Sequence, residues 1–158
     1  MKSSRWLPLG LFVLLAFLAA GIGSFATASS VDTWYASLRK PSWNPPSWVF
    51  GPVWTTLYLL MAVATWRVWR NGSPAEARHT FRLYGAQLAL NALWSILFFG
   101  LQRPGAALID VLVLWLVLIR LLARFIRVDR IAALLWAPYV LWVSFAAVLN
   151  AAIWELNR

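Results

Sequence analysis

Five long apolar runs, separated by short polar stretches, constrain the fold of this chain more than any other feature. An α-helix needs about 20 apolar residues to cross the hydrocarbon core of a membrane, and only helices or closed barrels satisfy their backbone hydrogen bonds there. We therefore predict an all-α integral membrane protein, a five-transmembrane-helix bundle that forms one domain over residues 1–158. The predicted spans cover residues of about 6–28, 46–70, 80–101, 106–125 and 131–154.

The composition supports this class. Hydrophobic residues make up 62% of the chain and charged residues 12%, against about 25% charged in an average soluble domain. The net charge of +9 would suit nucleic acid, but the basic residues flank the apolar runs, where anionic headgroups explain them. We therefore expect membrane lipid, and no nucleic acid, as a partner. The chain has no cysteine, which excludes disulfides and thiolate metal sites.

The first run, residues 6–28, has two interpretations. Basic residues precede it and Ala26-Thr27-Ala28 ends it, which is also the pattern of a cleaved secretory signal. We expect the run to be retained as a helix, because small residues such as Ala16 and Ala20 have the four-residue spacing of closely packed membrane helices.

Short connections between the spans make neighbouring helices antiparallel, so we expect an up-and-down bundle. The N-terminus and the second and fourth connections then lie on one side of the membrane, and the first loop lies on the other. The positive-inside rule places the N-terminus in the cytoplasm and the first loop outside, for a multi-pass protein of a bacterial cell membrane. Ten of the fourteen basic residues lie on the predicted cytoplasmic side: Lys2, Arg5, Arg67, Arg70, Arg78, Arg82, Arg120, Arg124, Arg127 and Arg130.

The stretch from Trp34 to Tyr58 differs from the other apolar runs, because it holds four of the twelve tryptophans and four of the eight prolines. Proline fixes φ and biases the residue before it toward extended geometry, so residues 40–46 should form a stiff, non-helical path after a short helix at about 31–38. Large flat side chains on such a backbone suit a lid, and we predict that this segment caps a ligand cavity. Pro52 lies within the second predicted span and should kink or loosen its first turns.

Polar and aromatic residues recur at helical spacing in three of the spans. An amide that faced lipid would cost about 1–3 kcal/mol, so the face with Gln87 and Asn91 should point into the bundle. These amides either bond neighbouring helices or contact a ligand. The three faces comprise Trp54, Tyr58, Met61 and Thr65; Gln87, Asn91, Trp94 and Phe98; and Trp142, Phe145, Ala146, Leu149 and Ile153.

The three faces form either a solid core or the wall of a cavity. They enclose a cavity if Gly51 and Ala146 leave space that the rings do not fill. Trp115 lies at mid-depth and should only pack. Tryptophans near the span ends are expected at the water interface whatever the function, and these are Trp6, Trp66, Trp69, Trp136 and Trp154.

Asp110 is the only acidic residue within a predicted span, and an intramembrane carboxylate is costly enough to be a functional candidate. It would serve a proton-coupled small-drug exporter, or it pairs with Arg103 near the membrane surface. His79 lies in a basic turn and is badly placed as a haem ligand. The sequence shows no metal cluster, catalytic triad or carboxylate pair, so we predict no metal and no conventional catalytic motif.

Three segments resemble, in order, the TspO/MBR family of tryptophan-rich sensory proteins and translocator proteins, also called the peripheral benzodiazepine receptor family. They are WYASLRKPSWNPPSWVFGPVWTTLY at residues 34–58, Gln87-Leu88 through Asn91 and Trp94 to Phe98-Phe99-Gly100, and Pro138-Tyr139 through Trp142, Phe145 and Ala146 to Leu149-Asn150. The resemblance covers nearly the whole chain. It implies a five-helix bundle, usually a homodimer, with a ligand cavity under the first loop.

The resemblance implies that the protein binds porphyrins, such as protoporphyrin IX and haem, and synthetic isoquinoline carboxamide or benzodiazepine-type ligands. No cofactor is required. A porphyrin is a flat π-system with carboxylate tails, which suits stacking on tryptophan and contact with Arg39 or Lys40 at the mouth, unless these two meet only lipid headgroups. Carried onto matching positions, the predicted binding residues are Tyr35, Trp54, Tyr58, Asn91, Trp94, Trp142, Phe145, Ala146 and Leu149.

Three functional hypotheses follow. The first is a receptor or translocator that binds porphyrins as a sensor or stress regulator and transports them. The second is an enzyme that degrades porphyrin in light, with Trp54 and Trp142 as redox-active side chains. The third is the exporter driven through Asp110. Animal relatives bind cholesterol through a Tyr and a basic residue after the Leu-Asn pair, but Ala151 and Glu155 stand there, so we do not expect cholesterol binding.

Overall fold

The computed structural model describes residues 6–158, and this part of the chain contains helices and no strands. Five of the helices are long and apolar enough to span a membrane, which confirms the predicted fold class. Lys2 and Arg5, which entered the charge prediction, lie outside the described residues. The long helices are α1 (Leu7–Ala28), α3 (Phe50–Asn71), α4 (Pro74–Ser95) with its π-helical extension η2 (Ile96–Gly100), α5 (Pro104–Val128) and α6 (Arg130–Asn157).

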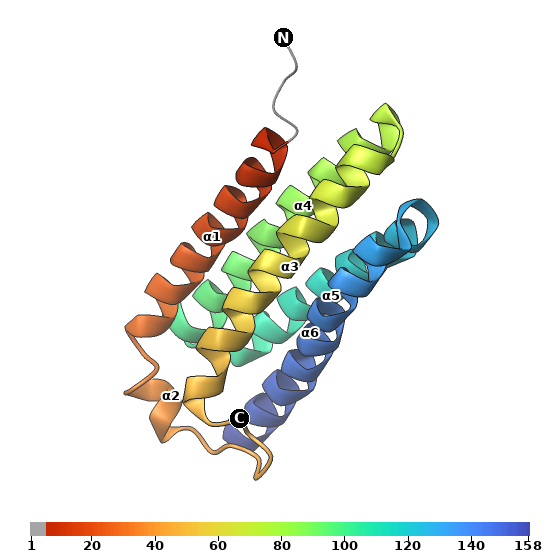
Figure 1. The fold of residues 1–158 in the computed structure, drawn as a ribbon. Helices are drawn as coiled ribbons and strands as arrows, with labels where there is room; N and C mark the ends of the chain where they lie inside the picture. The colour runs from red at the N-terminus through yellow and green to blue at the C-terminus, as the bar shows by residue number, and fades with distance from the viewer. Residues whose placement is uncertain (1–5) are drawn as a thin grey trace.

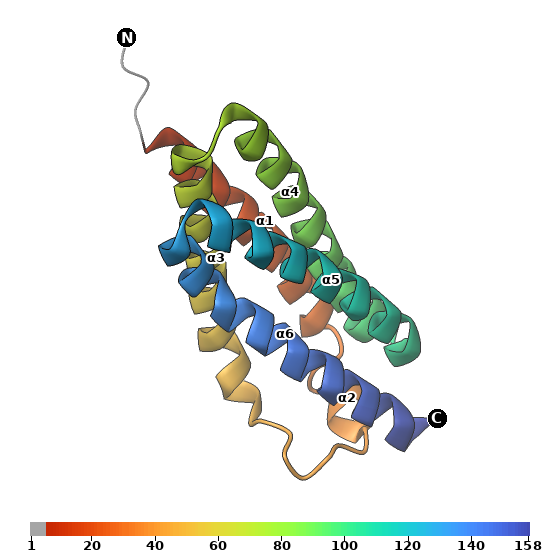
Figure 2. The ribbon, with the colours of Figure 1, turned by 90° about the vertical axis from the view of Figure 1, so that its right-hand side faces the viewer.

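The long helices run side by side as an up-and-down bundle (Figures 1 and 2). α1 packs against α3 and α4, while α5 packs against α4 and α6. The connection between α1 and α3 contains the short helix α2 (Trp34–Ser37) and a 3₁₀ turn, η1 (Ser47–Val49). This connection lies at the same end of the bundle as the end of α6, opposite to the start of α1 (Figure 1).

Two helix starts differ from the predicted bounds by four residues or more. α4 begins at Pro74, six residues before the predicted start of the third span at residue 80, because a capping box stabilises its polar first turn. The Glu76 N–H donates to the Ser73 hydroxyl at 3.3 Å, and the Ser73 N–H donates to the Glu76 carboxylate at 2.7 Å. α3 begins at Phe50, so Pro52 lies in its first turn, where the missing N–H removes no helical hydrogen bond.

Trp136 corrects the prediction that tryptophans near span ends lie at the water interface. Its side chain is 0% exposed, and its indole N–H donates to the Leu118 carbonyl on α5 at 3.2 Å. Its ring packs edge-on against Phe125 and Tyr139, at centroid distances of 5.1 and 5.4 Å. The prediction considered only the distance to the helix end, whereas Trp136 faces α5. Trp66 is also buried, while Trp6, Trp69 and Trp154 are exposed as predicted.

The turn between α5 and α6 is tied to the end of α3 through Asp129. Its carboxylate forms an ion pair with Arg67 at 2.9 Å and accepts a hydrogen bond from the Asn71 amide at 2.6 Å. It also caps α6 by accepting the N–H groups of Ile131 and Ala132. Burial of Asp129 opposes ionisation, but the Ala132 N–H and the Arg67 and Asn71 side chains outweigh it and hold the pKa below its ordinary value. These contacts fix the spacing of three helices at the arginine-rich end.

Candidate ligand-binding cavity

A cavity of about 400 Å³ lies in the half of the bundle that the α1–α3 connection covers. Its volume falls within the range of about 300–1,000 Å³ typical of small-molecule sites. α1, α3, α4 with η2, and α6 line it, and no residue of α5 does. We call residues 29–49 the lid, which contributes Val31, Tyr35 and Ser47 to the lining. The prediction that this segment caps a cavity agrees with this arrangement.

All nine residues predicted to bind a ligand line this one cavity, although they come from the lid and three different helices. The structure therefore brings the whole predicted set together, and its role in binding stays a prediction. The residues are Tyr35, Trp54, Tyr58, Asn91, Trp94, Trp142, Phe145, Ala146 and Leu149.

Aromatic rings on α3 and α6 form a large part of the cavity wall. Trp54 packs against Tyr58 with ring centroids 5.5 Å apart. Trp142 contacts Phe50 at 5.9 Å and Phe145 at 5.4 Å. These contacts hold the ring planes in defined positions without closing the space between the two helices.

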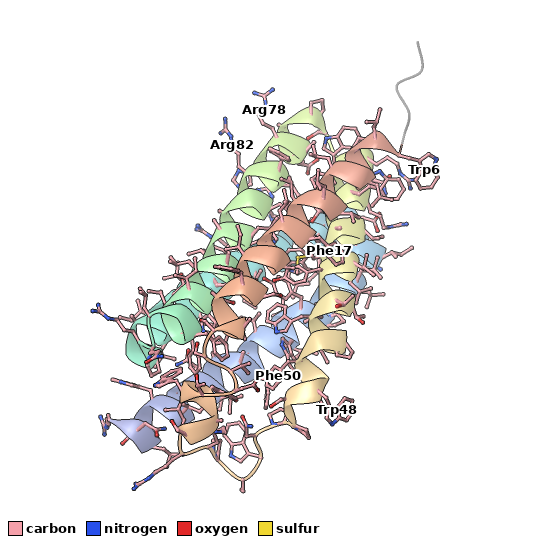
Figure 3. The ribbon with its side chains drawn as sticks, turned by 90° about the vertical axis from the view of Figure 1, so that its left-hand side faces the viewer. Trp6, Phe17, Trp48, Phe50, Arg78 and Arg82 are labelled. Carbon is pink, nitrogen blue, oxygen red and sulfur yellow. The ribbon has the colours of Figure 1, made fainter. Side chains whose placement is uncertain are left out.

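Small residues account for that space. Gly51 and Ala146 both line the cavity, as the sequence analysis required for a hollow interior. A Cβ atom built at Gly51 would meet nothing within 4 Å. Thr55 and Phe17 also line the cavity and are exposed, so the cavity reaches the bundle surface between α1 and α3. Figure 3 shows Phe17 and Phe50 on this side of the molecule, with Trp48 pointing away from the bundle.

A buried chain of hydrogen bonds closes the cavity floor. The Tyr58 hydroxyl donates to Asn91 Oδ1 at 2.6 Å, and Asn91 Nδ2 donates to the Tyr139 hydroxyl at 3.1 Å. Tyr139 in turn donates to Gln87 Oε1 at 2.8 Å. Gln87 is 0% and Asn91 5% exposed, which confirms that their helix face points into the bundle. Both amides bond neighbouring helices, and Asn91 does so while lining the cavity.

Tyr139 and Asn150 contribute to the site but were not among the residues predicted to be functional. Tyr139 joins α6 to the floor network, and Asn150 links three helices. The Trp94 indole N–H donates to Asn150 Oδ1 at 3.0 Å, and Asn150 Nδ2 donates to the Pro104 carbonyl at 2.8 Å. The available signal was the same as for Gln87 and Asn91, because an uncharged polar group in an apolar helix needs a partner.

The π-helical turn η2 positions two further rings at the site. Phe98 lies on the predicted aromatic face of the third span but was not among the predicted binding residues, and Phe99 was in neither set. Phe98 and Phe99 are consecutive, yet both line the cavity and both contact the Tyr35 ring, at 6.2 and 5.5 Å. Backbone groups freed by a π-turn need other partners, and Ser30 of the lid donates to the Phe99 carbonyl at 2.6 Å. This turn therefore supports the lid directly.

Lys40 does not lie free at the mouth of the cavity. Its ammonium group donates to the backbone carbonyls of Tyr35, Ala36 and Leu38 at 2.6, 3.2 and 3.0 Å, and lies 4.8 Å from the centroid of the Tyr35 ring. It thus stabilises the lid itself, whereas Arg39 is exposed. The Tyr35 hydroxyl donates to Asn44 Oδ1 at 3.0 Å. Burial raises the pKa of Tyr35, and the bond to Asn44 offsets part of that rise.

Asp110 lies away from this site. It is 6% exposed on α5, and its Oδ2 atom has no hydrogen-bond partner among residues 6–158. The predicted pairing with Arg103 is wrong, because the ion pairs of the described residues join only Arg67 to Asp129 and Arg158 to Glu155. The side chain is turned into the bundle at the seventh residue of α5 and does not reach back to the surface. Within residues 6–158 no group of acidic, His or Cys side chains could hold a metal.

Comparisons with known proteins identify the same family as the sequence resemblance. The model of the TspO/MBR family matches residues 12–155. The chain is 47% identical to the "Tryptophan-rich protein TspO" of Archaeoglobus fulgidus, over 91% of this chain and 94% of that protein. It is 41% identical to the "Tryptophan-rich sensory protein" of Cereibacter sphaeroides, over 92% and 91%. It is 38% identical to the "Translocator protein" of Bos taurus, over 97% and 92%. The chain is therefore a multi-pass membrane protein that belongs to the TspO/MBR family.

Proposed function

We propose that this protein is a membrane receptor, of the sensor or stress-regulator type, that binds porphyrins and related flat hydrophobic ligands in the cavity under the lid. The observation that carries the proposal is the arrangement of Trp54 on α3 and Trp142 on α6, which line one cavity together with Phe50 and Phe145. A tetrapyrrole presents two wide π-faces, and indole and phenyl rings stack on such faces with little loss of rotamer freedom.

The polar groups of the cavity favour a ligand that accepts hydrogen bonds. The Trp94 indole N–H is already bonded to Asn150, whereas the N–H groups of Trp54 and Trp142 have no partner within residues 6–158. Indole nitrogen only donates, so a matching ligand places a carbonyl or carboxylate oxygen near these two groups. Porphyrin carboxylates and the amide carbonyl of an isoquinoline carboxamide both meet this requirement.

Titration of the reconstituted protein with protoporphyrin IX, followed by ligand absorbance in the dark, tests the proposal. We expect Trp54→Ala and Trp142→Ala each to weaken binding at least about tenfold, because each removes a stacking face and a donor. Trp69→Ala is the matched control, since Trp69 is 40% exposed on the part of α3 remote from the cavity. Equal affinities for all three variants and the parent protein would exclude the cavity as the porphyrin site.

Competition experiments extend the proposal to its other ligands and partners. Haem and isoquinoline carboxamide or benzodiazepine-type ligands should displace protoporphyrin IX, because they would occupy the same cavity. Cholesterol should not. We also propose that the protein forms a homodimer in the membrane, which native mass spectrometry from lipid nanodiscs tests directly.

Light-dependent porphyrin breakdown is a second candidate function, favoured by the ring contacts of Trp54. This ring lies 5.5 Å from Tyr58 and 6.1 Å from Tyr139, so either tyrosine could donate an electron to an oxidised indole and become oxidised in its place. Porphyrin would absorb the light and dissolved oxygen would be the oxidant. Illumination should bleach porphyrin bound to the parent protein faster than porphyrin bound to the Trp54→Phe or Trp142→Phe variant. Equal bleaching rates in all three proteins would leave binding as the only activity.

The geometry gives no support to the exporter hypothesis, because Asp110 lies on the one long helix that contributes nothing to the cavity. We propose that the N-terminus lies in the cytoplasm and the lid outside a bacterial cell membrane. The chain has no cysteine, so Ser42→Cys in the lid should react with an impermeant thiol reagent added to intact cells.

A further inference from the structure

Among residues 6–158, a single side chain, Asn157, supplies the hydrogen bonds that join the middle of the lid to the bundle. The Arg39 N–H donates to Asn157 Oδ1 at 2.9 Å, and Asn157 Nδ2 donates to the Arg39 carbonyl at 2.9 Å, across 118 residues of sequence. We propose that Asn157 is a latch that holds the lid over the cavity and sets the rate of ligand exchange. The kinetic part of this inference rests on the proposed function, whereas the latch itself does not.

The Asn157 amide is held in place for this contact. Asn157 is the last residue of α6, where helical carbonyls lack partners, and its Nδ2 also donates to the Ile153 carbonyl at 2.7 Å. One amide hydrogen thus fixes the side chain to its own helix, while the other hydrogen and the oxygen bond the Arg39 backbone. The side chain pairs with Arg39 as a neighbouring β-strand would.

The middle of the lid, residues 32–46, has no other hydrogen bond to the helices within the described part of the chain. Among residues 6–158, the remaining hydrogen bonds of residues 32–46 stay within the lid, including those of Lys40 and the Tyr35–Asn44 pair. Beyond Asn157, this segment meets the helices through ring contacts such as Trp43 with Phe145, 5.9 Å apart. Its two ends are anchored, because α1 precedes it and α3 follows it. Movement of its middle therefore depends on the latch.

Loss of the latch has a defined kinetic signature. Two exposed amide–backbone hydrogen bonds contribute modestly to the stability of the closed lid. Removing both should raise the fraction of time that the lid is open by about tenfold. Asn157 does not line the cavity, so it bonds the lid equally whether a ligand is present or absent. The association and dissociation rates should then rise by the same factor, while Kd stays unchanged.

Stopped-flow mixing of protoporphyrin IX with the full chain in lipid nanodiscs measures both rates. Asn157→Leu replaces the amide with an apolar group of similar shape, and Glu155→Gln is the matched control because it breaks the ion pair with Arg158 at the same helix end without touching the lid. We expect about tenfold faster association and dissociation only in Asn157→Leu. Unchanged rates, or a change in Kd without a change in association rate, would overturn the gating role.

A second measurement needs no ligand. Ser42 is exposed in the lid and the chain has no cysteine, so a spin label on Ser42→Cys reports lid motion alone. Adding Asn157→Leu should make the label more mobile, and adding Glu155→Gln should not. Unchanged mobility would disprove the latch. Increased mobility in a protein that binds no porphyrin would support the latch and remove the proposed function instead.

Discussion

The hydrogen bond between Tyr58 and Asn91 should make a measurable contribution to stability, and a double-mutant cycle isolates it. The two residues are 6% and 5% exposed, and their donor and acceptor atoms are 2.6 Å apart. Asn91→Leu leaves the Tyr58 hydroxyl buried without its acceptor and removes a donor from Tyr139, at a cost of about 2–3 kcal/mol. Tyr58→Phe removes one hydroxyl and should cost about 1 kcal/mol.

The coupling energy is the informative quantity. Couplings measured between membrane helices average about 0.6 kcal/mol and reach about 1.7, because the unfolded chain in the membrane also finds partners. This bond is short, buried and part of a chain that continues to Gln87 through Tyr139, so we expect a coupling of about 1–1.7 kcal/mol.

Unfolding in mixed micelles, with the fraction of denaturing detergent increased stepwise, gives the four free energies of the cycle. Trp115→Phe provides the control cycle with Tyr58→Phe, because the Trp115 indole bonds Ser144 on a separate part of the bundle. The control pair should be additive within about 0.5 kcal/mol. A Tyr58–Asn91 coupling no larger than that of the control would refute the argument that this network holds the cavity floor.

Three further changes test other parts of the structure. Asp110→Asn should lower neither the porphyrin affinity measured by titration nor the melting temperature, because Asp110 Oδ2 has no hydrogen-bond partner among residues 6–158. A decrease in either quantity would show that Asp110 contributes to binding or to stability. Because the pKa of Asp129 is held below its ordinary value of 3.8, its stabilising effect is present above that value and is lost as the pH falls through the lower, folded-state pKa. The difference in melting temperature between the parent protein and Asp129→Asn should therefore be larger at pH 7 than at pH 3. A Cβ at Gly23 would lie 3.0 Å from the Ser95 hydroxyl, whereas Gly10 has open space, so Gly23→Ala should melt below Gly10→Ala.

The sequence was sufficient for the fold because the controlling signals are local. Each span is a largely apolar run of the right length; short polar turns join the second to the fifth span, and the lid joins the first two. The inward-facing positions followed from helical periodicity and from the cost of exposing an amide to lipid, as at Gln87 and Asn91. Placement of both amides inside the bundle needed no knowledge of their actual partners.

The sequence was insufficient where the outcome depends on contacts between distant segments. A lone asparagine at residue 157 carries no local sign that it will bond the backbone of residue 39. The sequence suggests that Lys40 is available to a ligand or headgroup, but in the folded lid its ammonium group donates its hydrogen bonds to nearby backbone carbonyls. The position of Trp136 near a helix end predicts a residue at the membrane–water interface, but the packing of α6 against α5 buries it.

The contacts that stabilise the bundle lie in a different part of its length from the proposed path of ligand exchange. At the arginine-rich end, the ion pair of Asp129 with Arg67 fixes α3 to the α5–α6 turn, and at mid-depth the floor network joins α3, α4 and α6. Beyond the floor, α3 and α6 meet through ring contacts, while Asn150 links α4, α5 and α6 by hydrogen bonds. Among residues 6–158, Asn157 supplies the hydrogen bonds that join the middle of the lid, residues 32–46, to the helices. Ring contacts tolerate small displacements, whereas buried hydrogen bonds and ion pairs do not. A ligand that binds as proposed could therefore displace the middle of the lid without loosening the ion pair or the floor network that keep the bundle folded.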